Sequence, residues 1–77
     1  MFQNLQRALT AADATFSDVV KLSFLLTDVA HLPTIRLVRD EYVDTARPPA
    51  STAVQVAGLF APEFLIEIEA VALVAED

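Results

Sequence analysis

The chain has 77 residues, so it forms one domain at most, and its lack of cysteine excludes disulfides and thiolate metal sites. Its five basic residues are spread along a chain of net charge −6, which argues against the basic face that general nucleic-acid binding requires. No apolar run approaches the roughly 18 residues of a membrane span, and the N-terminus lacks the basic start and apolar core of a secretory signal. We therefore expect a cytoplasmic protein that does not bind membranes.

Residues 2–12 are the first predicted element, an amphipathic helix. Phe2, Leu5 and Leu9 recur at helical spacing with polar residues between them. No capping residue precedes Phe2, so we expect the chain to start inside a longer helix.

A turn at Ser17 and Asp18 leads into the first predicted strand, which spans residues 19–26. Apolar and polar residues alternate there, as they do in a strand with one buried face. The residues expected on the buried face are Val20, Leu22, Phe24 and Leu26.

The second predicted helix follows. Thr27 and Asp28 can cap it, and Pro33 is tolerated in a first helical turn because its missing N–H would have no partner there. Its apolar stripe consists of Leu32, Ile35, Val38 and Tyr42. The residues expected to point outward are Arg36, Arg39 and Asp40.

Two further strands complete the pattern. Pro48 and Pro49 end the helix, residues 51–56 alternate as a second strand, and residues 65–74 form a third after a loop at 58–62. Alternation predicts one polar sheet face made of Ser51, Ala53, Gln55, Glu67 and Glu69. The order helix, strand, helix, strand, strand predicts an α+β fold with the helices on the apolar face of one sheet. The aromatic residues expected to pack as core are Phe2, Phe24, Tyr42 and Phe60.

Three stretches of the chain are similar to motifs of one known family. Residues 4–12, 19–21 and 24–28 resemble its NL…L…A, VVK and FLTD segments. Residues 49–59, PASTAVQVAGL, are similar to its PARSTVQVA.L segment, and residues 65–72, LIEIEAVA, are similar to its VEIEAIA ending. In this order and spacing, they resemble the YjgF/RidA family of reactive intermediate deaminases, formerly labelled endoribonuclease L-PSP.

The resemblance implies a chorismate-mutase-like trimer in which the polar sheet face lines the subunit interfaces. It also implies chains of roughly 130 residues, within the usual size of one domain. Residues 1–77 are then expected to be a single, incomplete domain that lacks the family's N-terminal strands. A 55% hydrophobic chain this short fits the expectation of a homo-oligomer, because a monomer would struggle to hide its apolar side chains.

Ser51 stands where the resemblance implies the arginine that pairs with a substrate carboxylate. A serine hydroxyl supplies neither the charge nor the two parallel hydrogen bonds of a guanidinium. One reading makes Ser51 and Thr52 substrate-binding residues of an altered pocket that no longer takes a carboxylate. The other makes Ser51 a strand residue at an edge or interface.

Arg47 lies four residues before Ser51, a span of roughly 13 Å in an extended chain. It is a candidate substrate-binding residue, and the alternative is an arginine that balances the dipole at the end of the second helix.

Glu67 is the candidate catalytic residue, because the resemblance implies a glutamate that positions the hydrolytic water at this place. A carboxylate near a subunit interface can orient or deprotonate water. The alternative is an exposed strand glutamate.

His31 is the only histidine, and it has no neighbouring cysteine, nucleophile or second ligand in the sequence. We therefore expect a surface residue at a helix start. No metal, no cofactor and no phosphate-binding glycine loop are expected.

Three functions stay open at this point. The first is a divergent family member that binds or hydrolyses a small reactive imine or enamine at a subunit interface and is inactive on carboxylate substrates. The second is a non-catalytic small-molecule-binding or assembly remnant of the fold. The third is the endoribonuclease activity of the family's older label, against which the acidic charge counts.

Overall fold

The computed structural model of the protein describes residues 1–74. Its elements are α1 (Phe2–Ala11), the 3₁₀ helix η1 (Phe16–Asp18), β1 (Val19–Leu26), the 3₁₀ helix η2 (Val29–His31), α2 (Leu32–Arg39), β2 (Ala50–Gln55) and β3 (Ile66–Ala72). The predicted order and the α+β class are confirmed. Within this part of the chain, no helix is long and apolar enough to cross a membrane.

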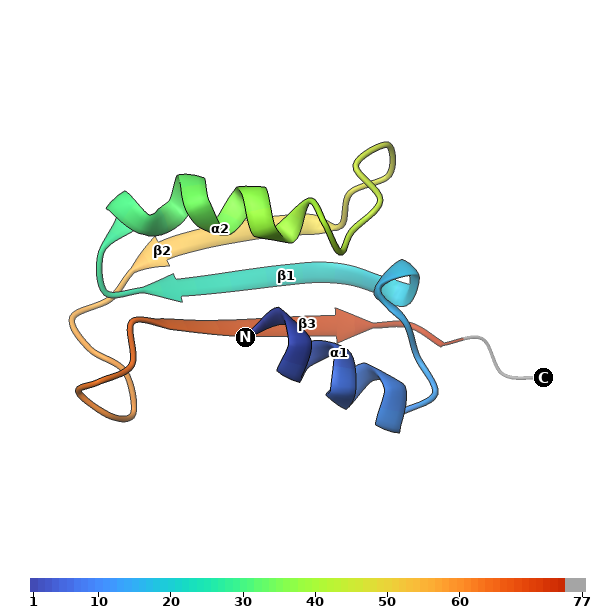
Figure 1. Ribbon diagram of the computed structural model, residues 1–77, viewed down its shortest axis with the longest axis horizontal. Coiled ribbons are helices and arrows are strands. Elements are labelled where there is room, and N and C mark those ends of the chain that lie inside the picture. The colour runs from blue at the N-terminus through green and yellow to red at the C-terminus, as the bar shows by residue number, and fades with distance from the viewer. Residues whose placement is uncertain (75–77) are drawn as a thin grey trace.

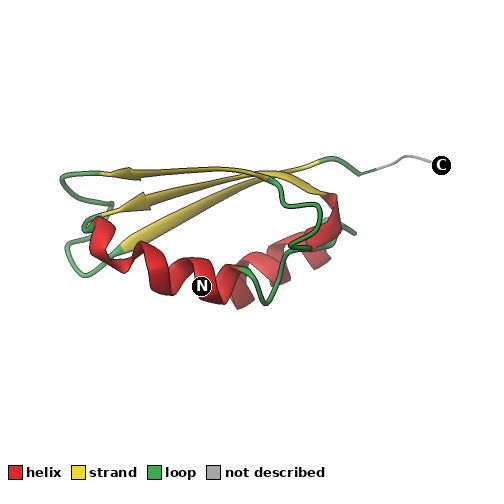
Figure 2. Ribbon diagram, turned by 90° about the horizontal axis from the view of Figure 1, so that it is seen from above, coloured by secondary structure: helices red, strands yellow, loops and turns green. Residues whose placement is uncertain are grey.

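The three strands form one sheet in the order β2-β1-β3 (Figure 1). β1 pairs in parallel with β2 and antiparallel with β3. Parallel neighbours need a crossover connection, and α2 provides it between β1 and β2. Figure 2 shows both α helices beneath the sheet and nothing described above it, so the sheet has a helix-covered face and a bare face.

The buried face of β1 departs from simple alternation at its start. Val19 is 6% exposed whereas Val20 is 44% exposed, so the prediction that Val20 faces the core is wrong. A shift in the β1–β3 register between Val19 and Lys21 accounts for the difference. Such a bulge inserts one extra residue and moves the residues before it to the other face.

The faces of β2 are also the reverse of the prediction. In the parallel register Ser51 lies beside Leu22, and Thr52 lies beside Ser23. Neighbouring residues in a sheet share a face, and Leu22 is fully buried under the helices. Ser51, Ala53 and Gln55 therefore lie on the helix-covered face. Because Glu67 pairs with Leu25, and Glu69 with Ser23, both glutamates lie on the bare face.

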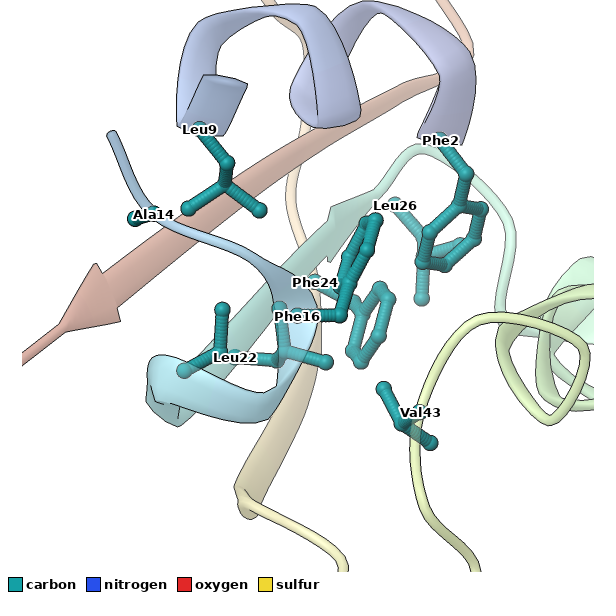
Figure 3. Close-up of a cluster of buried hydrophobic side chains, with 9 residues drawn as sticks. Phe2, Leu9, Ala14, Phe16, Leu22, Phe24, Leu26 and Val43 are labelled. Atoms are coloured by element: carbon teal, nitrogen blue, oxygen red, sulfur yellow. The ribbon is translucent and has the colours of Figure 1, made fainter. Parts of the chain in front are cut away.

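The core lies between the helices and the sheet (Figure 3). Its aromatic centre is a stack of Phe2 on Tyr42, with ring centroids 5.3 Å apart and planes at 13°. Phe16, which the sequence did not single out, also packs on Tyr42 at 5.3 Å. Phe60 is 97% exposed, so its predicted place in the core is wrong; it lies in the loop between β2 and β3.

Short polar caps hold the connections. Asp28 caps η2, where its Oδ1 accepts a hydrogen bond of 2.9 Å from the Ala30 N–H. Thr15 and Asp18 form a capping box around η1. α1 has Met1 as its N-cap, with no side-chain hydrogen bond, as the uncapped start predicted. η1 leads directly into β1, and η2 leads directly into α2.

Candidate functional site

A small cleft separates α2 from β2 on the helix-covered side of the sheet. Its volume is about 60 Å³. The residues that line it are Phe24, Leu32, Arg36, Arg39, Ser51, Thr52 and Ala53. We call this feature the α2–β2 cleft. It is where the structure brings two of the predicted substrate-binding residues together with charged groups.

Arg36 and Arg39 are the charged groups of the α2–β2 cleft. Their spacing of three places both on one side of α2. The Arg39 side chain is 22% exposed and pairs with Asp40 through an Nη2–Oδ1 distance of 3.0 Å. Arg36 and Asp40 are exposed, as predicted, whereas Arg39 is only half-exposed. The crossover lays α2 along β2, so the two arginines border the strand as well as solvent.

Ser51 contributes a hydroxyl to the cleft. The Ser51 Oγ lies 3.4 Å from the Pro49 carbonyl oxygen, long for a hydrogen bond between oxygens. Thr52 also borders the cleft, although its register beside Ser23 assigns its side chain to the bare face. Both residues are exposed on an edge strand, and their part in a contact surface or a pocket stays a prediction.

Glu67 lies away from the cleft. It is an exposed residue of β3, beside Leu25 on the bare face. Ser51 is on the opposite face and on the strand at the other side of β1. Within one chain, Glu67 and Ser51 therefore cannot contact the same small molecule.

Arg47 is exposed in the turn between α2 and β2, where its N–H donates to the Asp44 carbonyl oxygen at 3.1 Å. α2 ends at Arg39, so Arg47 is not at the helix terminus, and the dipole alternative is wrong. Arg47 is also not among the residues that line the α2–β2 cleft. Its role as a substrate-binding residue stays a prediction.

His31 ends η2 and is exposed, as expected for a surface residue. Among residues 1–74, no group of His, Cys, Asp and Glu is placed to hold a metal ion. No polar or charged side chain in this range is buried either. The candidate residues consequently lie at the surface, where water screens them unless another chain covers them.

The sequence alone does not identify Arg36 and Arg39 as residues of the α2–β2 cleft. Their spacing of three was a usable signal, since it puts two guanidinium groups on one helical stripe. Which strand this stripe borders depends on where α2 crosses the sheet. The parallel pairing of β1 with β2 determines that position.

A larger groove of about 320 Å³ lies between the two helices. Its lining is mostly apolar and includes Phe2, Ile35 and Tyr42. None of the candidate catalytic or substrate-binding residues borders it.

The chain is similar to a known protein family and to solved structures. The model of the family described as Endoribonuclease L-PSP matches residues 1–74. No curated protein matches. Many solved structures do, and one is a YjgF-family member from Mycobacterium tuberculosis with 34% identity and a TM-score of 0.87 over 95% of this chain.

Two further solved structures extend this result. A yeast protein has 31% identity and a TM-score of 0.84 over 92% of this chain. A Rid-family protein from Yersinia pestis has 26% identity and a TM-score of 0.87 over 95%. This chain spans 61%, 55% and 57% of the mycobacterial, yeast and Yersinia chains, respectively. The match over residues 1–74 and the shared fold show that the chain belongs to the Endoribonuclease L-PSP family, also known as the YjgF/RidA family.

Proposed function

We propose that this protein is a divergent family member that binds or hydrolyses a small reactive metabolite of the imine or enamine class at a subunit interface. The observation that carries the proposal is the exposed place of Glu67 on the bare face of the sheet. The family resemblance adds that Ser51 replaces a carboxylate-binding arginine. In this proposal the chain keeps the residue that handles water and lacks the residue that holds a substrate carboxylate.

Ser51 and Glu67 lie on opposite faces of the sheet, so a site that uses both residues must lie between chains. A molecule that contacts both residues needs Ser51 from one chain and Glu67 from another. The bare face is the surface available for such an assembly, and we assign it to the subunit contacts of a homotrimer, the usual state of this family. The proposed compartment is the cytoplasm, where the family is typically found.

The proposed reaction needs few catalytic groups. Hydrolysis of an imine needs a water molecule directed at the carbon and a group that moves a proton, and a carboxylate such as Glu67 can do both. Ser51 and Thr52 would contact the substrate through hydroxyl groups, with Arg47 as a further candidate from the preceding turn. The reaction requires no cofactor. Amino-acid imines are poor substrates in this proposal, because Ser51 cannot form the paired, charge-assisted hydrogen bonds with their carboxylate.

The test compares two imines. One is generated in situ from a simple amine by an amine oxidase and has no carboxylate, and the other is 2-aminoacrylate. With the first imine, we expect the wild-type protein to release ammonia faster than the uncatalysed reaction does. In Glu67→Gln, the protein-dependent part of this rate should fall by about 10²–10⁴-fold, the usual contribution of a general acid or base. Equal rates with and without protein for both imines would remove the catalytic proposal.

The non-catalytic alternative makes a different prediction. It keeps ligand binding at Ser51 and Thr52 and assembly through the bare face, and it shows no ammonia release with either imine. The endoribonuclease label belongs to the family's description, and we do not extend it to this chain, because five basic residues against eleven acidic ones offer no phosphate-binding face.

A further inference from the structure

We propose that the groove between the two helices binds a neutral aromatic molecule that carries one hydrogen-bonding group. The rings of this ligand lie on the apolar floor of the groove, and its hydrogen-bonding group meets the hydroxyl of Tyr42. None of Ser51, Thr52 and Glu67 borders the groove. The inference therefore goes beyond the proposed function and does not depend on it.

Three elements build the groove on the helix-covered side of the sheet. Ile66 and Ile68 of β3 form its floor, since they pair with the buried Leu26 and Phe24 and share their face. The first turn of α1 forms one wall, and α2 with the turn after it forms the other. The wall residues are Met1, Phe2 and Gln3 from the first and Thr34, Ile35, Val38 and Tyr42 from the second.

The charge of the groove is the first argument. None of the side chains that line it is charged, although the chain has eleven acidic and five basic residues. A charged ligand group buried against these side chains would lose hydration without gaining an opposite charge, which is costly. A neutral ligand avoids that cost. The lining therefore favours an uncharged molecule and differs in this respect from the arginine-bordered α2–β2 cleft.

The apolar surface left in contact with water is the second argument. Val38 is 37% exposed at the rim of the groove. The half-buried apolar residues of the lining are Ile35, Ile66 and Ile68. Removing such surface from water is favourable roughly in proportion to its area. A ligand with a mostly apolar body gains that contribution over both the floor and the α2 wall.

The aromatic stack at the groove is the third argument. Phe2 and Tyr42 both line it, and their rings lie nearly parallel with centroids 5.3 Å apart. A further planar ring can extend such a stack in the offset geometry that aromatic pairs prefer. A rigid ring system also loses less conformational freedom on binding than a flexible alkyl chain does. These two properties favour an aromatic ligand.

The unpaired polar groups are the fourth argument. Within residues 1–74, no hydrogen bond of the chain involves the side chains of Gln3, Thr34 or Tyr42. Tyr42 is half-buried, whereas Gln3 and Thr34 are exposed. A hydrogen bond is stronger where water is partly excluded. The Tyr42 hydroxyl is therefore the partner we assign to the polar group of the ligand.

The volume of the groove sets the size of the ligand. It is about 320 Å³, whereas a cavity of roughly 150 Å³ holds one benzene molecule. Two fused rings with a small substituent satisfy that limit. The groove also stays open in the proposed homotrimer, because it lies on the helix-covered side and the subunit contacts are assigned to the bare face (Figure 2).

The test is a titration of the gel-filtered 77-residue chain with three probes that differ in one substituent: 2-naphthol, naphthalene and 2-naphthoate. The chain has no tryptophan, so no indole emission overlaps the naphthyl fluorescence. We expect one 2-naphthol to bind per chain and to shift the ¹⁵N-labelled amides of the lining residues. Naphthalene should bind about 2–10-fold more weakly, the contribution of one hydrogen bond. The charged 2-naphthoate should bind more weakly than either.

Two substitutions and one control locate the binding. Val38→Phe fills the groove and should weaken 2-naphthol binding by about tenfold or more, whereas Leu37→Phe, at a 72% exposed neighbour outside the lining, should leave it unchanged. Tyr42→Phe removes only a hydroxyl group and should lower the affinity for 2-naphthol to that for naphthalene. Circular dichroism checks that each variant folds, and the Tyr42→Phe comparison stands even if Val38→Phe does not.

Three results would overturn the inference. The first is a Val38→Phe chain that folds and binds 2-naphthol like the wild type. The second is equal affinity of the wild type for 2-naphthol and 2-naphthoate, and the third is a Tyr42→Phe chain that keeps the preference for 2-naphthol over naphthalene. None of these measurements uses an imine. A chain that binds 2-naphthol in this way and releases no ammonia supports this inference while removing the catalytic proposal.

Discussion

Ser51 and Glu67 lie on opposite faces of one sheet, with Ser51 beside the buried Leu22 and Glu67 beside Leu25 on the bare side. They also occupy the two strands that flank β1. This relationship separates Ser51, which we propose replaces a carboxylate-binding arginine, from the candidate catalytic glutamate. It explains why any site that uses both residues requires contact between chains.

The first prediction concerns Ser51. We expect negligible hydrolysis of 2-aminoacrylate by the wild-type chain and a gain of about one to two decades in Ser51→Arg, since a charge-assisted pair contributes about 1.5–3 kcal/mol. Thr52→Arg is the matched control, because its register puts the new guanidinium on the other face, and it should give no gain. Steady-state ammonia release measures all three. A wild-type rate equal to that of the arginine variant would refute the role assigned to Ser51.

The second prediction concerns the aromatic core. Phe2 is 5% exposed and stacks on Tyr42, so Phe2→Ala should lower the free energy of unfolding by about 3–5 kcal/mol. A chain of this size has about 4–12 kcal/mol in total, so this variant should lose a large share of its stability. Phe60→Ala, at a residue that is 97% exposed, should change stability by less than about 0.5 kcal/mol. Urea unfolding at one protein concentration compares them, and equal losses would contradict the placement of the core.

The third prediction concerns His31. It is exposed at the end of η2, and its side chain has no hydrogen-bond or ion-pair partner among the described residues. His31→Ala should therefore leave assembly and ammonia release unchanged. Light scattering coupled to gel filtration and the ammonia assay test this directly. A large loss in any of them would assign His31 a part in the site.

The fourth prediction concerns assembly of the 77-residue chain. β2 and β3 each pair only with β1 in the described sheet, which leaves two open edges and a bare face. Open strand edges and exposed apolar residues promote association, and a core this small stabilises a monomer only marginally. We expect the chain to form oligomers, to exchange secondary-structure elements between chains or to aggregate. Light scattering coupled to gel filtration measures the outcome.

Two variants locate that association. Val54→Glu puts a charge on the bare face and should weaken it, whereas Leu37→Glu, at a 72% exposed position on α2, should not. A monodisperse monomer whose thermal unfolding is cooperative and independent of concentration would show that the fourth prediction is wrong.

The local elements of this protein follow from its sequence alone. β1 spans the residues that alternation predicted, α1 ends within one residue of its predicted end, and Asp28 caps the turn after β1. The family could also be recognised from the sequence, because its three motifs are short continuous stretches. These stretches form α1, β1, β2 and β3. These features depend on neighbours a few positions apart, which periodicity and capping describe directly.

The faces of the sheet and the site were decided by the tertiary structure. Every residue of β2 is exposed, so alternation of apolar and polar residues carried no information about which side of this edge strand meets the helices. Hydrogen bonding to β1, more than 25 residues earlier, set Ser51 under α2 and brought it beside Arg36 and Arg39. The bulge at Val19 and the exposed place of Phe60 likewise depend on pairing and packing with distant residues. A one-residue change in register exchanges the two faces of a strand, and pairing with a distant strand fixes that register.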